Sequence, residues 1–221
     1  MMADKLKLYK PISPFTLLQA FGEDLTCVDS ATKKICKTRS DGQACPSGYE
    51  SLYQSVGLKG HDGLDVTAWL GQPVYSAIDG VVMEIHTDRE RGLGVDIVSS
   101  SKFTFDRTPH SEAGECFAKT RYWHLDRVES LSIGQSIRVG ERIGWAGKTG
   151  NASGYHLHFE LKLVNQGLSG EYFNIFQNNS YYGAIDPYPF MQELAAFEMN
   201  SWLTRQKYIF ADWMRKPRST S

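Results

Sequence analysis

The stretch that most constrains the fold runs from His156 to Leu163 and reads H-L-H-F-E-L-K-L. In a β-strand, successive side chains point to opposite faces. His156 and His158 therefore share one face, and Glu160 lies with them on the same period, whereas Leu157 and Phe159 point the other way. This pattern predicts a strand that presents two imidazoles to one site.

A second stretch, Gly60-His61-Asp62-Gly63-Leu64-Asp65, offers an imidazole and a carboxylate four positions apart between glycines. A catalytic zinc usually has three protein ligands drawn from His, Asp, Glu and Cys, and it keeps one position open for water. His61, Asp65 and one of the two histidines of the H-L-H stretch would complete such a set. The remaining histidine would then be available for proton chemistry.

Residues 61–163 contain short apolar runs broken by glycine turns. Examples are residues 72–77 (QPVYSA), 80–86 (GVVMEIH), 94–98 (GVDIV) and 136–139 (SIRV). Strands at short, regular intervals predict an antiparallel all-β sandwich or barrel. Glycines 144, 147, 150 and 154 lack the strand-to-helix context of a phosphate-binding loop, so turns before the H-L-H strand explain them better.

Four ordered blocks of the chain carry a family resemblance. They are residues 60–66 (GHDGLDV), 71–82 (GQPVYSAIDGVV), 122–125 (YWHL) and 139–160 (VGERIGWAGKTGNASGYHLHFE), with weaker matches at 21–24 and 186–187. In this order they resemble the M23 family, the lysostaphin-like or LytM-like zinc endopeptidases that cut peptide bonds in bacterial peptidoglycan. An H-x-x-x-D motif alone would be a weak signal, but four blocks in order are specific.

The resemblance implies a LytM-type domain, which is a compact antiparallel β fold with its site in a groove on one sheet. It implies one Zn²⁺ ion held by His61, Asp65 and His158. His124 and His156 would then be the catalytic pair, and peptides of bacterial peptidoglycan would be the substrate. Which peptide bond is cut stays open, because groove-wall loops set that choice.

A zinc ion lowers the pKa of a bound water from about 15.7 to roughly 7. The chain has no H-E-x-x-H motif, so the glutamate base of that protease class is missing. His124 and His156 can accept the proton or stabilise the oxyanion, with the division of roles left open. Glu160 is either an acceptor that orients an imidazole or an ordinary solvated carboxylate.

Composition excludes several other classes. The 221 residues are 41% hydrophobic and 22% charged, with a net charge of -1, which is typical of a globular domain and gives no reason to expect nucleic-acid binding. We expect no membrane span, because no run approaches 18 apolar residues. We recognise no signal peptide at the N-terminus. The expected place of action is the bacterial cell wall, reached by phage delivery or after removal of a leader.

The four cysteines, Cys27, Cys36, Cys45 and Cys116, permit disulfides in a loop-rich segment, and buried thiols are the alternative. No C-x-x-C pair is present, which argues against a separate structural zinc. Cys116 and His124 make a poor cysteine-protease dyad, because Cys116 lies in a polar stretch without a nucleophile context.

We expect three segments. Residues 1–56 form an N-terminal strand-and-loop segment packed on the core, residues 57–187 form the M23-like domain with an insertion at about 99–120, and residues 188–221 form a C-terminal helical extension. The insertion either shapes the groove or is neutral decoration. The extension either packs on the β domain or docks another protein.

Two functions compete. The first is a zinc endopeptidase of peptidoglycan. The second is a non-catalytic M23-like protein that activates an amidase or serves as a structural part of a phage particle. Degenerate M23 domains usually lack a metal-site residue, and this chain lacks none, which favours the enzyme.

Overall fold

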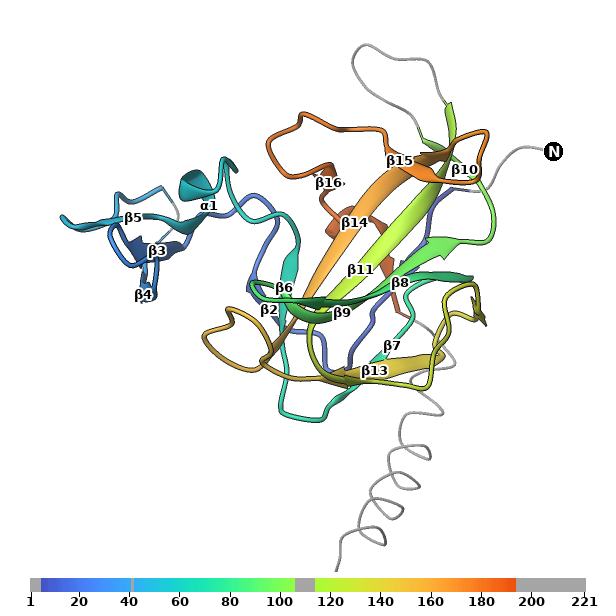
Figure 1. Cartoon of the computed structure of the whole chain (residues 1–221), viewed down its shortest axis with the longest axis horizontal. Helices are drawn as coiled ribbons and strands as arrows, with labels where there is room; N and C mark the ends of the chain where they lie inside the picture. The colour runs from blue at the N-terminus through green and yellow to red at the C-terminus, as the bar shows by residue number, and fades with distance from the viewer. Residues whose placement is uncertain (1–4, 41, 106–113, 194–221) are drawn as a thin grey trace, which may run out of the picture.

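The structure, a computed structural model, describes residues 5–40, 42–105 and 114–193 (Figure 1). Within these ranges the helical elements are one short α-helix, α1 (Leu52–Ser55), and one 3₁₀ turn, η1 (Tyr188–Phe190). All other regular elements are strands, and their pairings are antiparallel apart from that of β1 with β17. The predicted antiparallel all-β core is confirmed.

A 12-stranded sheet carries the fold, and seven of its strands follow one another in space in the order β12-β8-β9-β11-β14-β6-β2. Long strands occupy its centre, and β11 and β14 run side by side across the molecule (Figure 1). The strands are β2 (Leu17–Gln19), β6 (Leu64–Thr67), β7 (Pro73–Tyr75), β8 (Gly80–Asp88), β9 (Gly92–Ser99), β10 (Phe103–Phe105), β11 (Gly114–Val128), β12 (Ser136–Ile137), β13 (Arg142–Ala146), β14 (His156–Gln166), β15 (Tyr172–Asn174) and β16 (Ala184–Ile185).

Strand β11 closes the core by pairing with different partners along its length. Its first part pairs with β9 and β14, and its end pairs with β13, which in turn pairs with β7. Side chains from both groups of strands meet in one buried cluster, which includes Tyr122, Phe159, Val74 and Ile143. Apolar residues from strands distant in sequence therefore enclose a single core.

Strand β14 is buried on both faces over its first nine residues. Its apolar set, Leu157, Phe159, Leu161 and Leu163, belongs to the core cluster. The alternate residues, His156, His158, Glu160 and Lys162, are also buried. The period of two thus separates an apolar face from a polar face, and the polar face forms the floor of the site described below.

The predicted insertion at about 99–120 is described in two parts. Residues Phe103–Phe105 form β10, which pairs with the start of β11, and Phe103 and Cys116 are buried in the core. The described parts therefore extend the sheet as an antiparallel strand pair. Their contribution to a groove stays a prediction.

The N-terminal region contributes a small sheet of its own, in the order β4-β3-β5, that lies to one side of the large sheet (Figure 1). Its strands are β3 (Thr26–Asp29), β4 (Ile35–Thr38) and β5 (Tyr49–Ser51). A disulfide joins Cys27 to Cys45, which is one of the two alternatives that the sequence left open. Cys36 is an exposed thiol.

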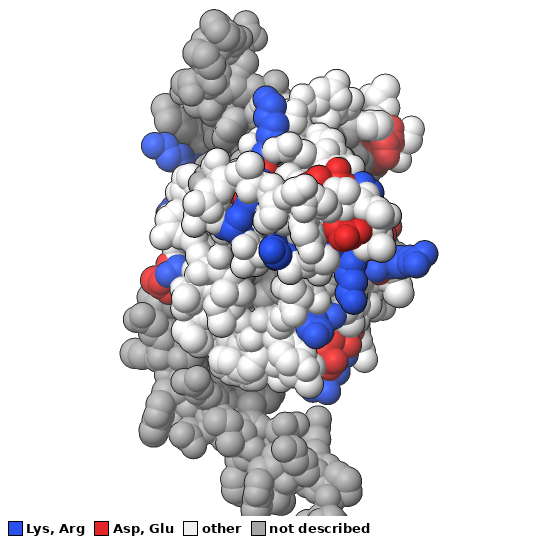
Figure 2. Space-filling view, turned by 90° about the vertical axis from the view of Figure 1, so that its left-hand side faces the viewer, with Lys and Arg blue, Asp and Glu red and all other residues white. Residues whose placement is uncertain are grey.

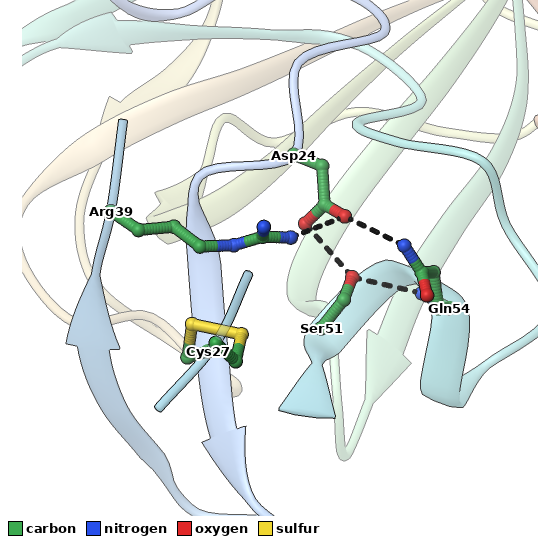
Figure 3. The surroundings of a disulfide bond; sticks show 6 residues. Asp24, Cys27, Arg39, Ser51 and Gln54 are labelled. Atoms are coloured by element: carbon green, nitrogen blue, oxygen red, sulfur yellow. Dashed lines mark hydrogen bonds and ion pairs between the residues drawn. A yellow bond between two sulfur atoms is a disulfide. The ribbon is translucent and has the colours of Figure 1, made fainter. Parts of the chain in front are cut away.

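The side chain of Asp24 connects segments at the edge of this small sheet (Figure 3). Its carboxylate accepts hydrogen bonds from Ser51 Oγ at 2.8 Å and Gln54 Nε2 at 3.2 Å, and it lies 2.6 Å from the guanidinium of Arg39. Ser51 also caps α1 by accepting a hydrogen bond from the backbone N–H of Gln54 at 3.1 Å. The side chains of these residues link the strands of the small sheet to α1, which leads into the first metal-site block.

Charges of both signs are interspersed with uncharged residues on the side of the molecule shown in Figure 2. This mixed surface agrees with the near-neutral net charge. In the described ranges, no helix combines the length and the apolar character needed to cross a membrane.

Both ends of the described chain pack together. Strand β1 (Leu8–Tyr9) pairs in parallel with β17 (Met191–Gln192), and Leu8 is fully buried. The expected helix from 188 is wrong up to residue 193, because the chain forms the turn η1 and then β17. Pro189 lacks the N–H of a helix interior, and Met191 is extended at ψ 134°. The rest of the predicted C-terminal helical extension, residues 194–221, lies outside the described residues.

Candidate metal centre

The register of two neighbouring strands brings the predicted ligands together. Strands β6 and β14 are antiparallel, and Asp65 on β6 lies directly opposite His158 on β14. Directly opposite residues in an antiparallel pair project to the same face. His61 comes just before β6, and its backbone N–H donates to the carbonyl of Glu23 at 2.9 Å. The H-x-x-x-D block and the H-L-H strand thus meet although they lie far apart in sequence.

Three potential ligand atoms converge at this place. Nε2 of His61 lies 2.9 Å from Nδ1 of His158. Oδ1 of Asp65 lies 3.2 Å from Nε2 of His61 and 3.0 Å from Nδ1 of His158. Ligand atoms about 2.0–2.2 Å from one tetrahedral zinc lie roughly 3.3 Å apart. The donor set therefore fits a single zinc ion.

Asp62 offers another carboxylate within reach of the same two histidines. Its Oδ1 faces the opposite nitrogen of His158, with 3.7 Å between Oδ1 and Nε2. Its Oδ2 lies 2.6 Å from the guanidinium of Arg91. Asp62 is therefore paired with a cation, whereas Asp65 faces the point where the two imidazoles meet.

The two ring nitrogens of each proposed ligand histidine have different surroundings. Nδ1 of His61 lies 3.2 Å from the carbonyl of Ala20, and its Nε2 faces His158 and Asp65. Nε2 of His158 is buried, makes no hydrogen bond in the described structure and lies 3.4 Å from Oε1 of Glu160, while its Nδ1 faces Asp65. The nitrogens that converge on Asp65 are therefore Nε2 of His61 and Nδ1 of His158.

The surroundings favour a positive charge at this point. Burial by itself lowers the pKa of His158, but the carboxylates of Asp65 and Glu160 overcome this effect and raise the pKa to about 9. Burial likewise opposes ionisation of Asp65, yet the neighbouring His61 and His158 hold its pKa well below the ordinary range. The carboxylates beside these imidazoles thus favour a positive charge at this point.

His124 reaches the site through an unusual backbone conformation. Its φ is +61°, and the register between β11 and β9 shifts between Tyr122 and Leu125. In a regular strand, Trp123 and His124 would point to opposite faces. The irregularity allows both to lie on the site side, while Tyr122 and Leu125 stay in the core.

His124 and His156 form a pair beside the converging atoms, with ring centroids 4.6 Å apart. Nδ1 of His124 donates to the carbonyl of Thr149 at 2.8 Å, and Nδ1 of His156 donates to the carbonyl of Gly154 at 3.0 Å. The Nε2 atoms are on the opposite side of each ring, and that of His156 lies 3.6 Å from Oδ1 of Asp65. Burial, followed by the neighbouring His156 and His158, lowers the pKa of His124 to about 3.

Two residues that support the site escaped the sequence analysis. Thr149 orients His124, and its hydroxyl also donates to the carbonyl of Leu125 at 2.7 Å. Gly63 leaves room for His158, because a Cβ at this position would lie 2.9 Å from Nε2 of that ring. Gly63 could have been found from the sequence, because it stands between His61 and Asp65 in the H-x-G-x-D block. The hydrogen bond between the Thr149 carbonyl and His124 could not, because it joins residues that are distant in the sequence.

A second group of possible metal ligands in the described structure is Glu84, His86 and Asp96. The two carboxylates lie on different nitrogens of His86, at 3.3 Å from Nδ1 and 3.1 Å from Nε2. Arg121 also binds Asp96, with its Nε 2.9 and 3.0 Å from the two carboxylate oxygens. The two carboxylates thus approach opposite sides of one imidazole, and one of them is already paired with a cation.

A family comparison agrees with this geometry. The model of Peptidase family M23 matches residues 59–170, which is half of the chain. The chain belongs to peptidase family M23. The M23 region includes His61, Asp65, His124, His156 and His158.

M23 relatives share part of their length with this chain. Peptidoglycan DD-endopeptidase ShyB of Vibrio cholerae is 34% identical over 106 residues, which cover 48% of this chain and 21% of ShyB. Glycyl-glycine endopeptidase ALE-1 of Staphylococcus capitis is 28% identical over 157 residues, which cover 70% of this chain and 35% of ALE-1. The solved structure of a zinc containing peptidase from Vibrio cholerae aligns with a TM-score of 0.48 at 23% identity, over 78% of this chain and 39% of that one.

Proposed function

We propose that this M23 protein is an endopeptidase that uses one zinc ion to hydrolyse peptide bonds in bacterial peptidoglycan. The observation that carries the proposal is the convergence of His61, Asp65 and His158, whose ligand atoms lie 2.9–3.2 Å from one another. The named activities of ShyB and ALE-1 agree with an endopeptidase and with a cell-wall substrate. The expected place of action is accordingly the bacterial cell wall.

In the proposed site, His61 and His158 supply imidazole nitrogens and Asp65 supplies a carboxylate oxygen. A zinc ion bound there would act as a Lewis acid that activates water and polarises a carbonyl. Two neutral imidazoles and one carboxylate would leave a net positive charge on the ion. The fourth position would remain for solvent or substrate.

His124 and His156 handle protons in this proposal. Each ring holds its Nδ1 proton against a backbone carbonyl, so each offers Nε2 as an acceptor. One ring would accept a proton from the attacking water at Nε2 and return it to the amine that leaves when the C–N bond breaks. The other ring, in its protonated form, would donate to the developing oxyanion.

The test is release of peptides from purified bacterial cell walls. The zinc-loaded protein should lower the turbidity of a wall suspension, and mass analysis of the soluble fragments should identify the cleaved bond. A chelator should stop the reaction, and added zinc should restore it. A zinc-loaded protein that releases no wall peptide would contradict the proposal and favour a non-catalytic M23 protein.

A further inference from the structure

Glu160 is a fully buried carboxylate that faces three cationic side chains. Lys162 Nζ lies 3.3 Å and Arg121 lies 3.4 Å from Oε2, and Arg91 contacts Oε1. Taking an ionised carboxylate out of water costs several kcal/mol unless partners compensate it. Three cationic side chains thus stabilise the ionised form of this buried carboxylate beneath the site.

The same carboxylate reaches the metal centre. Oε1 of Glu160 accepts a hydrogen bond from Trp123 Nε1 at 2.9 Å and lies 3.4 Å from Nε2 of His158, a buried nitrogen that makes no hydrogen bond in the described structure. Nε2 is the nitrogen of His158 that faces away from Asp65. Gly63 closes the other side of that nitrogen, so the ring has little room to turn.

Asp62 is the other carboxylate near this nitrogen, and geometry favours Glu160 over it. Oδ1 of Asp62 lies 3.7 Å from Nε2 of His158, farther than the 3.4 Å of Glu160 Oε1. Glu160 also lies on the same strand face as His158, two residues further along β14, so the strand itself holds the spacing.

The charges of the surrounding network balance. Three carboxylates, Asp62, Asp96 and Glu160, are paired with Arg91, Arg121 and Lys162. The ion-pair contacts of Asp65 in the described structure are with histidines. Glu160 can therefore act on His158 without adding net negative charge around the ion.

We propose that Glu160 is a positioning residue that accepts the Nε2–H of His158 and so keeps the lone pair of Nδ1 directed at the metal. This inference rests on the proposed zinc site. Carboxylates that hold a ligand histidine in this way typically contribute 10–100-fold to metal affinity. Neutralising or withdrawing the carboxylate should therefore loosen the ion.

The experiment compares Glu160→Gln and Glu160→Asp with two matched variants in the full chain. The glutamine removes the charge, and the aspartate keeps the charge but withdraws it from His158. Asp96→Asn is the control, because Asp96 is buried in the same ion-pair network and binds Arg121 but has no contact with His158. Asp62→Asn tests the rival carboxylate.

Zinc affinity is measured by competition with a chromophoric chelator, and the absorption spectrum of the cobalt-substituted protein reports the ligand field. Both Glu160 variants should bind zinc about 10–100-fold more weakly, with an altered cobalt spectrum. Asp96→Asn should match the wild type in zinc affinity and in the cobalt spectrum. Thermal unfolding of each metal-free variant identifies any variant that fails to fold. If Glu160→Gln does not fold, Glu160→Asp, which keeps the charge balance, is the variant that tests the inference.

Wild-type affinity in both Glu160 variants would overturn the inference, as would an equal loss in Asp96→Asn. A loss confined to Asp62→Asn would also overturn it, in favour of Asp62. These results leave the proposed function standing if the wild type binds zinc and releases wall peptides. A wild type that binds no zinc would instead remove the proposed function itself.

Discussion

Oδ1 of Asp65 lies 3.0 Å from Nδ1 of His158, although 93 residues separate the two in the sequence. The contact exists because β6 and β14 are neighbours in the sheet and because these residues are directly opposite in register. A slip of one residue would turn one of the side chains to the other face. The register of this strand pair therefore decides whether a metal site can form.

Replacing His61 or Asp65 by Ala should abolish metal retention, because each change removes one of three converging ligand atoms. We expect zinc affinity to fall by more than about 100-fold, since changes of outer partners alone cost 10–100-fold. The zinc content of each variant after dialysis measures this loss of metal retention. His86→Ala is the control, because the contacts of His86 are with Glu84, Asp96 and the ring of Trp123, none of which is a proposed ligand. Stoichiometric zinc in either ligand variant would contradict the assignment.

Replacing His124 by Ala should leave the zinc content unchanged and lower turnover by about 10²–10⁴-fold, the usual contribution of a group that transfers protons. The reason is that Nε2 of His124 offers an acceptor beside the proposed ligands without being one of them. Metal analysis checks the zinc content, and wall-peptide release by the same preparation checks the turnover. Wild-type turnover would remove His124 from the mechanism.

Thr149→Val should lower turnover and stability together, whereas Thr149→Ser should keep most of both. The hydroxyl accepts from the backbone N–H of Leu93 at 2.9 Å and donates to the carbonyl of Leu125 at 2.7 Å, so it fixes the loop whose carbonyl orients His124. Unsatisfied backbone groups cost about 1–3 kcal/mol each. Denaturant unfolding and rate measurements test this. A serine variant as impaired as the valine variant would show that the methyl group matters instead.

Gly63→Ala should weaken zinc binding and lower stability. The added Cβ would lie 2.6 Å from the carbonyl oxygen of Phe159 and 2.9 Å from Nε2 of His158, so strand or ring must shift. Gly154→Ala is the matched control, since a Cβ there meets nothing within 4 Å. Thermal unfolding and chelator competition measure both variants. Equal behaviour of the two alanines would contradict the steric argument.

Removal of the Cys27–Cys45 disulfide should destabilise the small N-terminal sheet. Closing a loop with a sequence separation of 18 residues contributes about 3 kcal/mol in the chain-entropy account. The double serine variant should therefore show local unfolding and faster proteolysis between residues 26 and 51. Cys36→Ser should change stability by less than about 0.5 kcal/mol, because Cys36 is exposed. Proteolysis at the wild-type rate in the double variant would contradict the prediction.

The local pattern of the sequence predicted the strand content and the polar face of β14, since a period of two depends on neighbouring residues alone. The same pattern failed at residues 188–193, and residues 194–221 lie outside the described ranges. Apolar residues at helical spacing predicted a helix there, but residues 191 and 192 pair with β1. A contact with the opposite end of the chain outweighed the local periodicity, and single-sequence periodicity carries no information about such a contact.

The sequence by itself determined which chemistry was available: imidazoles and carboxylates in ordered blocks, on a strand that alternates polar and apolar residues. Tertiary structure alone decided how these groups meet. The left-handed conformation of His124, the hydrogen bond from Thr149 and the cations around Glu160 all arise from strand register and close packing. Those interactions join residues distant in the chain, so their geometry appears only when the strands are in place.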